Sequence, residues 1–358
     1  MFINCELQGA PNEWGGPRRE RLSKALTVDI HNHFEVKAAI DLMADATKER
    51  ARSQPGFPYF RNDFSREVTR RQREQNKDRL SDPATRIKDM DAMGIDIQAL
   101  SVTPAQTYYW AEAELGRDAA QLINDQLASI ASAYPERFVA MGSVPLQNTE
   151  FAIAEMERCV EKLGMRGLQL ATNVAGEELS QPRLEKFFSR AEELDMFLFL
   201  HPVGFNQGGR LIDHHFGNLI GNPLDSTVCV MHLIFDGTIA RHPGLKICVA
   251  HGGGFIGAYP ARMDHGYFAR EDCRIQLSEP PTAYLKRLYF DTMVFGDDQL
   301  KYLIDKYGAE QILLGTDYCA DMGETNPVGL VESIDNLSQH DRDAICGLNA
   351  AKLLRIAC

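Results

Sequence analysis

The chain has 358 residues, of which 44% are hydrophobic and 25% charged, and its formal net charge is −12. This composition is ordinary for a globular enzyme. The acidic balance argues against a nucleic-acid partner, because phosphate recognition depends on clustered basic residues. The most apolar run, residues 196–200, is far shorter than the roughly 18 residues of a membrane helix, so we predict no membrane partner either.

The N-terminus and the cysteines indicate the cellular compartment. Residues 1–16 contain no basic segment followed by an apolar one, so we expect no secretory signal. The eight cysteines are scattered and form no Cys-x-x-Cys pair. In a chain of this length they are expected to be reduced thiols, and we predict a cytoplasmic protein.

Short apolar and β-branched runs recur along the chain, and helical patterns separate them. We expect strands at 27–30, 95–102, 138–144, 167–172, 196–201, 245–251, 288–292 and 311–317. The clearest helical patterns cover 119–134, 150–163, 182–194 and 298–307. Strands that alternate with helices imply a parallel sheet of the α/β class, and eight such units imply a closed (β/α)8 TIM barrel.

Two segments do not belong to the minimal barrel. Residues 1–26 form an N-terminal extension rich in Gly, Pro and Arg, and residues 27–358 form the metal-dependent barrel domain. A highly charged insert of about residues 43–85 follows the first strand. We interpret it as a solvated helical cap; the alternative is a lid that supplies an arginine to an anionic substrate.

Histidines and one aspartate fall at the ends of expected strands, where the catalytic groups of a barrel lie. The first strand runs into His31 and His33, and their spacing of two places both imidazoles on one side of an extended chain. His201 ends the fifth strand and Asp317 ends the eighth. Three imidazoles and a carboxylate suit Zn²⁺, with Mn²⁺ as an alternative. We predict one divalent ion at these four residues.

His251 ends the sixth expected strand and is followed by three glycines, which leave space for a ligand. Since four other residues can hold the metal, we expect His251 to act beside it as an acid, a base or a polarising group. The glycine run lacks the lysine and the spacing of a phosphate-binding loop, so we expect no organic cofactor. Asp291, at the end of the seventh strand, is a candidate hydrogen-bond partner for a site histidine.

The order His-x-His, His-Pro, His-Gly-Gly-Gly and Gly-Thr-Asp resembles the amidohydrolase superfamily (amidohydrolase 2 type). Within it, the chain is similar to the α-amino-β-carboxymuconate-ε-semialdehyde decarboxylase family and to related non-oxidative aromatic-acid decarboxylases. The resemblance spans about residues 27–355 and includes the segments 86–91, 98–101, 134–138, 221–227, 242–247 and 314–318. It implies one divalent metal, usually zinc, on the four predicted ligands, with His251 as the catalytic histidine.

The resemblance implies an activity as well. The expected reaction is release of CO₂ from a hydroxylated or amino-substituted aromatic, heteroaromatic or muconate-semialdehyde acid. Asp317 and His251 are the expected catalytic residues: either Asp317, or a metal-bound water polarised by His251, would deliver a proton to the carbon that loses CO₂. The resemblance also implies that Arg262 and Arg270 contact the substrate or a subunit interface. We therefore expect a homodimer or a dimer of dimers.

Several aromatic residues and one further histidine are candidates for substrate contact. Phe295 and the aromatic run 108–110 can pack against a flat ring, and His215 can approach the substrate from the long loop after the fifth strand. Arg71 and Arg73 lie near the position of the insert arginine of the semialdehyde decarboxylases, although neither matches it cleanly.

Two alternatives use the same scaffold. The first is a metal-dependent hydrolase or hydratase of a ring-cleavage product or a lactone, since a metal-activated water needs the same ligands. The second is a non-catalytic metal-binding protein. The end of the fourth strand, residues 169–172, has no lysine of the kind that bridges two metals in binuclear amidohydrolases, which favours one ion.

Overall fold

The computed structural model describes residues 14–16, 20–22, 25–54 and 61–357. Most of the predicted N-terminal extension and positions 55–60 of the insert therefore lie outside the described residues. The proposed division at residue 26 stays a prediction.

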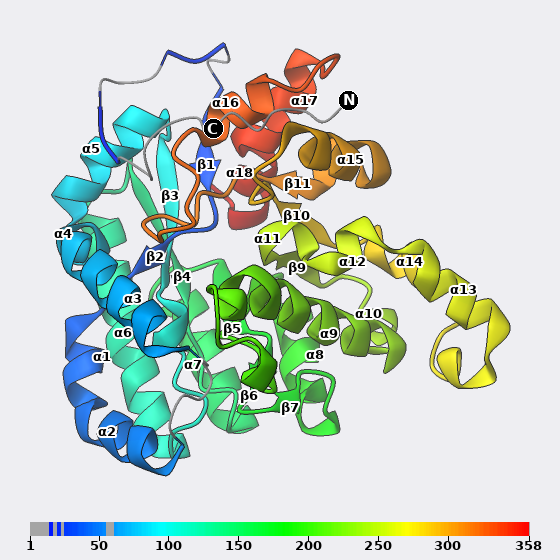
Figure 1. Cartoon of the computed structure of the whole chain (residues 1–358), viewed down its shortest axis with the longest axis horizontal. Helices are drawn as coiled ribbons and strands as arrows, with labels where there is room; N and C mark the ends of the chain where they lie inside the picture. The colour runs from blue at the N-terminus through cyan, green and yellow to red at the C-terminus, as the bar shows by residue number, and fades with distance from the viewer. Residues whose placement is uncertain (1–13, 17–19, 23–24, 55–60, 358) are drawn as a thin grey trace.

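A barrel of parallel strands forms the centre of the molecule (Figure 1). In sheet order these are β1 (Val28–Asp29), β3 (Ile97–Val102), β4 (Phe138–Gly142), β5 (Gly167–Ala171), β8 (Phe197–His201), β9 (Lys246–Val249), β10 (Tyr289–Asp291) and β11 (Ile312–Leu313). The first and last strands meet through backbone hydrogen bonds, among them one of 3.0 Å from the Ile30 amide to the Leu314 carbonyl. The predicted (β/α)8 barrel is confirmed.

The expected first strand, residues 27–30, corresponds to β1. A further short strand that was not predicted, β2 (His33–Phe34), follows it, and both pair with β3. A small antiparallel hairpin, β6 (Asn173–Val174) and β7 (Glu177–Glu178), lies outside the barrel sheet.

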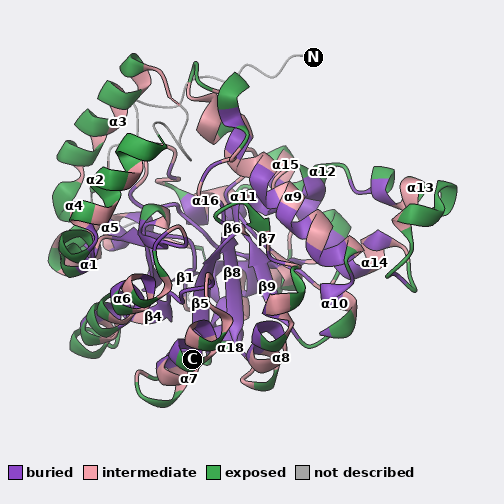
Figure 2. Cartoon of the chain, turned by 90° about the horizontal axis from the view of Figure 1, so that it is seen from below, coloured by how far each residue is buried: buried purple, intermediate pink, exposed green. Residues whose placement is uncertain are grey.

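Helices surround the barrel, and their outward faces are exposed while the strands are buried (Figure 2). The α-helices after the insert are α6 (Ala113–Ala133), α7 (Thr149–Glu161), α8 (Glu185–Glu193), α9 (Asn222–Phe235), α10 (Thr238–Arg241), the single turn α11 (Ala250–Gly253), α12 (Phe255–Ala258), α13 (Ala261–Ala269), α14 (Pro281–Leu285), α15 (Asp297–Tyr307), α16 (Pro327–Glu332), α17 (Gln339–Asp343) and α18 (Asn349–Leu354). The four predicted helices correspond to α6, α7, α8 and α15. None of the described helices combines the length and the apolar character that a membrane crossing requires.

The charged insert is helical where it is described. It comprises α1 (Lys37–Leu42), α2 (Ala44–Ser53), α3 (Asp63–Gln75), α4 (Lys77–Ser81) and α5 (Pro83–Met93). Helix α3 begins where the Asn62 side chain accepts a hydrogen bond from the Ser65 amide at 2.8 Å. Neither α2 nor α3 has a fully buried residue, as a solvated cap predicts. The helical segment starts at Lys37, six residues before the predicted boundary.

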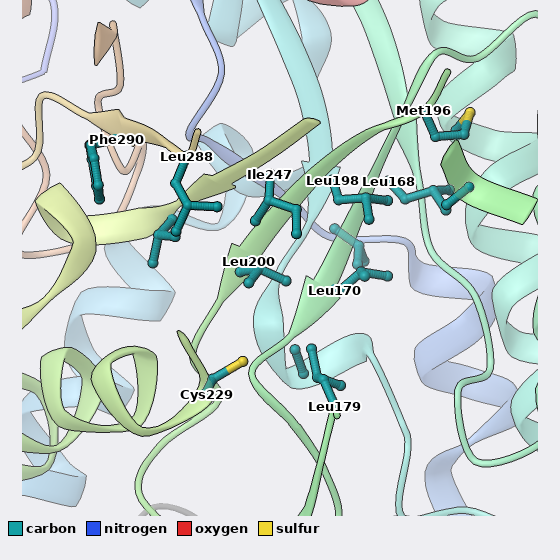
Figure 3. Packing of buried hydrophobic residues seen from close by; sticks show 14 of the residues in the cluster. Leu168, Leu170, Leu179, Met196, Leu198, Leu200, Cys229, Ile247, Leu288 and Phe290 are labelled. Carbon is teal, nitrogen blue, oxygen red and sulfur yellow. The ribbon is translucent and has the colours of Figure 1, made fainter. Parts of the chain in front are cut away.

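Alternate residues of the strands fill two separate apolar layers. Leu168, Leu170, Leu198 and Leu200 belong to the large cluster between strands and helices (Figure 3). Phe199, one residue away on β8, belongs to a smaller cluster that also contains residues of β1, β3, β9 and α18. Since successive side chains of a strand point to opposite faces, the smaller cluster fills the barrel interior. Polar groups are therefore placed beyond it, at the carboxyl ends of the strands.

A fully buried arginine connects the insert to the barrel. Arg86 on α5 is 0% exposed. Its guanidinium donates to Gln98 Oε1 at 2.9 Å, to the His33 carbonyl at 2.8 Å and to Asn32 Oδ1 at 3.0 Å. It also lies 4.6 Å from the ring centroid of Tyr318. Burial lowers the pKa of this guanidinium, although nearby carboxylates oppose the shift.

Replacing this arginine tests its importance for folding. We expect Arg86→Met to lower the free energy of unfolding by about 3–5 kcal/mol, because several buried acceptors lose their donors at once. Urea unfolding followed by circular dichroism measures the change. Arg70→Met, on the exposed face of α3, is the matched control and should leave the midpoint unchanged. Equal midpoints for the two variants would contradict this role for Arg86.

Candidate metal centre

Four side chains from distant parts of the sequence converge at the carboxyl ends of the strands. His31, His33, His201 and Asp317 are all buried, and one ligand atom from each lies within 4.8 Å of the others. Asp317 Oδ1 is 3.1 Å from His33 Nε2 and 3.4 Å from His31 Nε2. The structure thus brings together all four residues predicted as ligands.

Hydrogen bonds on the far side of two imidazoles orient these rings. His31 Nδ1 lies 2.6 Å from Asp291 Oδ2, which confirms the predicted role of that aspartate, and His201 Nδ1 lies 2.8 Å from the Pro202 carbonyl oxygen. The Nε2 atoms of His31 and His201 are buried and have no hydrogen-bond partner among the described residues. Buried polar atoms without a partner are costly. A divalent cation would satisfy both atoms, so this donor set fits a metal ion.

The charges at the site suit metal binding. Burial alone would raise the pKa of the Asp317 carboxyl, but the charge of His31 and hydrogen bonds from neighbouring histidines outweigh it, so the pKa falls well below its usual value. Burial lowers the pKa of His201 well below its usual value, and lowers that of His33. Asp317 is therefore ionised and these two imidazoles are neutral near pH 7, the states in which they ligate metals.

His31 differs from the other two histidines. Burial lowers its pKa, but the paired carboxylates of Asp317 and Asp291 outweigh that effect and raise the pKa to about 10. Without a cation, the two carboxylates thus retain a proton on this imidazole. A bound metal ion would replace that proton as the positive charge between them.

His251 stands beside the four ligands in a left-handed turn. Its Nε2 is 3.8 Å from Asp317 Oδ2. The prediction of a strand through residue 251 is wrong at its end, because β9 stops at Val249 and His251 has φ 57°. The three glycines that follow also have positive φ, and a Cβ at Gly254 would overlap the Pro223 carbonyl oxygen. Only glycine permits this close turn.

A buried carboxylate beneath the metal ligands supports their backbone. Asp29 Oδ2 accepts from the Thr316 hydroxyl at 2.7 Å, and Asp29 Oδ1 accepts from the His31 amide at 3.0 Å. Burial raises the pKa of Asp29 to about 6, although these hydrogen bonds oppose the shift. The sequence analysis did not single out this residue.

Two cavities open from the ligand group. The metal cavity, about 390 Å³, is lined by His33, His201 and Asp317, together with residues of the insert. The β10 cavity, about 320 Å³, is lined by His251 and Asp317 and by residues that follow β10. Both share Asn218 and Asn222.

The predicted substrate contacts divide into two groups. His215 lines the metal cavity, where burial lowers its pKa, and Phe295 lines the β10 cavity with 52% of its surface exposed. Arg262 instead lies on α13, which projects from the barrel (Figure 1), and Arg270 directly follows that helix; both are exposed. Arg270 pairs with Asp272 at 2.6 Å. Within the described chain, neither arginine lines the two cavities, so one protomer does not bring them to its own metal centre.

Of the two insert arginines named from the resemblance, Arg73 of α3 lines the metal cavity and Arg71 does not. Other residues of the cavity walls were not predicted, among them Arg61 in the segment before α3. Asn218 and Asn222 lie four residues apart on adjoining helical turns, and that spacing was the available signal. Nothing local in the sequence relates the insert arginines to the strand ends.

Comparisons with known proteins place the chain in a family. The amidohydrolase family model matches residues 28–356. The chain belongs to the amidohydrolase family. A relative of this amidohydrolase, the 2-amino-3-carboxymuconate-6-semialdehyde decarboxylase of Dictyostelium discoideum, is 36% identical over 274 residues, which is 76% of each chain. The predicted family is confirmed, and on such relatives the predicted class, a carboxy-lyase, is confirmed as well.

Two further comparisons concern the fold and the range of activities. The structure of 5-carboxyvanillate decarboxylase from Novosphingobium aromaticivorans, with bound manganese, matches with a TM-score of 0.82 and 22% identity over 95% of this chain and 100% of the other. The 2-keto-4-carboxy-3-hexenedioate hydratase of a Sphingobium strain is 26% identical over 329 residues, which is 88% of this chain and 87% of that protein. The first comparison supports the barrel.

The orientation of His31 by Asp291 leads to a test of metal affinity in this amidohydrolase. We expect Asp291→Asn to weaken metal binding by about 10- to 100-fold, because the imidazole loses its charged hydrogen-bond acceptor. Competition with a fluorescent chelator measures the affinity. Asp297→Asn, at the exposed start of α15, is the control and should bind like the wild type. Unchanged affinity in Asp291→Asn would show that this contact does not support the ligand.

Proposed function

We propose that this carboxy-lyase releases CO₂, without oxidation, from a hydroxylated or amino-substituted aromatic, heteroaromatic or muconate-semialdehyde acid. The observation that carries the proposal is the group of three imidazoles and one carboxylate at the wall of a 390 Å³ cavity, with His251 alongside. A cavity of this size suits a small organic acid. The curated relatives include decarboxylases of such acids, which supports the same substrate class here.

We propose Zn²⁺ as the native ion, with Mn²⁺ as the alternative. Three imidazoles and one carboxylate suit both, and the structural neighbour from Novosphingobium aromaticivorans holds manganese. When bound, the ion supplies a Lewis acid that draws electron density from an oxygen substituent of the substrate. Metal analysis of the purified protein distinguishes the two ions.

Arginines of the insert are proposed to hold the substrate carboxylate. Arg61 and Arg73 both line the metal cavity, and Arg73 forms an ion pair with Glu35 at its wall. A guanidinium can bind a carboxylate through two parallel hydrogen bonds. His215 lines the same cavity and adds a nitrogen for substrate contact.

Asp317 and His251 are proposed to manage the proton. When the bond between the substrate carbon and its carboxylate breaks, the electron pair stays on the carbon, and that carbon must then gain a proton. Asp317 and His251 lie 3.8 Å apart and line the β10 cavity together. They are therefore the titratable pair placed to carry a proton to the reacting carbon.

Removing the histidine tests this assignment. We expect His251→Ala to keep about one metal per chain and the wild-type fold, but to lose at least 100-fold in CO₂ release, because general acid–base catalysis typically contributes that much. Manometric CO₂ assay and elemental analysis measure the two properties. His340→Ala, on the exposed surface of α17, is the control. Full activity in His251→Ala would remove His251 from the mechanism.

Hydration is the second candidate, and the Sphingobium hydratase relative favours it. A screen over hydroxylated benzoates, hydroxypicolinates and carboxymuconate semialdehydes separates the two reactions. Loss of substrate with equimolar CO₂ supports decarboxylation. Loss of substrate without CO₂ supports hydration at the same centre.

We propose that two copies pair through the projecting segment around α13, residues 259–275, which we call the arm. Phe268, Ile275 and Tyr259 on this arm are 68%, 75% and 66% exposed, and so large an apolar surface is typical of an interface. Arg262 lies on the same arm, so pairing offers a route for it to reach a second copy's cavity. The compartment we propose is the cytoplasm, since the six described cysteines are free thiols and five of them are buried.

Charging the arm tests the pairing. We expect the double variant Phe268→Asp, Ile275→Asp to sediment as a monomer, because burying two carboxylates in an interface is unfavourable. Analytical ultracentrifugation measures the mass. Phe64→Asp, a comparably exposed phenylalanine at 74% on α3, should keep the wild-type assembly. If the double variant sediments like the wild type, the arm is not the interface.

A further inference from the structure

A third cavity lies beside the metal cavity, beneath the first helices of the insert. Its volume is about 380 Å³. We call it the aromatic chamber, and its main walls are Ile40, Arg50, Tyr108, Tyr109, Trp110 and Val203. None of the predicted metal ligands lines this chamber.

The aromatic chamber continues into the metal cavity. Glu35, Arg73, Thr103 and Ala105 line both of them. A ligand held at the metal ligands can therefore extend past these four residues into the chamber. A cavity of roughly 150 Å³ already admits benzene, so the metal cavity alone has room for a single-ring acid. The additional 380 Å³ exceeds what such an acid needs.

The chamber has the walls of a site for a planar apolar group. The rings of Tyr108 and Trp110 pack edge to face, with centroids 6.0 Å apart. The Arg50 guanidinium carbon lies 4.6 Å from the Trp110 ring centroid. Tyr109 is only 5% exposed, and the sole neighbour recorded for its hydroxyl within the described residues is the Ala171 backbone. Aromatic surfaces of this kind bind rings in stacked or edge-on geometry, and the Tyr109 hydroxyl can serve a polar substituent on one.

An ion pair lies at the junction of the two cavities, whereas the Arg50 guanidinium in the chamber lies against the Trp110 ring. Arg73 pairs with Glu35, whose side chain is 17% exposed. An acidic group is therefore best held at Arg73 or on the metal side of it, and the apolar remainder of the ligand on the chamber side.

We propose that the aromatic chamber binds a second planar group of the substrate, so that the acid acted on here carries an aryl substituent on its carboxylate-bearing ring or diene. The proposal rests on the proposed function only in naming this ligand a substrate. It deepens that function by specifying an acid longer than a single-ring benzoate.

Binding to the metal-loaded protein tests the proposal. Titration calorimetry compares salicylate with 3-, 4- and 5-phenylsalicylate, which direct the added ring along different paths. We expect at least one phenylsalicylate to bind tenfold or more tightly than salicylate, equivalent to about 1.4 kcal/mol. If no phenylsalicylate binds more tightly than salicylate, the proposal is wrong.

Substitutions that fill the chamber provide a second test of the proposal. Thr47 lines the chamber from α2 and is exposed, whereas its neighbour Lys48 is exposed and does not line it. Thr47→Trp should abolish the phenyl advantage and leave salicylate affinity within twofold of the wild type, while Lys48→Trp should keep the advantage. Ala51→Trp and Arg52→Trp form a second such pair on the same helix. A phenyl advantage that survives both chamber-filling variants would place the ring elsewhere and overturn the proposal.

The outcome is separable from that of the proposed function, because the titration measures binding and not turnover. A phenyl advantage that depends on Thr47, with no CO₂ from any acid, supports the chamber and contradicts the decarboxylase. If single-ring acids release CO₂ and no phenylsalicylate binds more tightly than salicylate, the decarboxylase is supported and the chamber is contradicted.

Discussion

The metal centre depends on the meeting of the first and last strands of the barrel. The carbonyl of His31 accepts hydrogen bonds from the amides of Thr316 and Asp317, at 3.2 and 2.7 Å. We call this contact between the first and last strands the seam. Because metal ligands come from both sides of the seam, closing the sheet also brings the ligands together. The Asp29 carboxylate reinforces the seam by bonding to Thr316 and to the His31 amide. A barrel that failed to close would present a pair of histidines and a separate aspartate.

The seam also concentrates charge in a buried region. Asp29, Asp291 and Asp317 are buried around it, and Arg86 is the buried cation nearby. Asp29 and Asp291 each accept several hydrogen bonds, and Asp317 lies against the imidazoles of His31 and His33, so these charges are balanced by protein groups. Within the described residues, the Nε2 atoms of His31 and His201 make no hydrogen bond, although His31 Nε2 lies 3.4 Å from Asp317 Oδ1. A cation at these positions would bind both nitrogens and balance the buried carboxylate charge.

The sequence predicted the features that a local pattern reports, and it missed those that depend on contacts between distant segments. The ligands His31, His33, His201 and Asp317 were predictable because strand ends of a barrel share one edge, so a one-dimensional pattern reports a three-dimensional group. The turn at His251 was not, since it depends on the contact between Gly254 and Pro223. Packing between distant segments also decides two other features. These are the projecting position of Arg262 and Arg270 and the place where the insert meets the two cavities. No local pattern encodes such packing.

Arg86 connects the insert to the backbone of the metal centre. One guanidinium holds the His33 carbonyl and, through a 3.0 Å bond to the Arg79 carbonyl, the end of the insert. The Arg86 guanidinium therefore anchors both the insert helices and the backbone of a metal ligand. Side chains on α2 and α3 face the cavities away from this contact and can be replaced without disturbing it. The scaffold thus separates the choice of acid from the chemistry performed on it, which makes the insert the natural region in which to redesign selectivity.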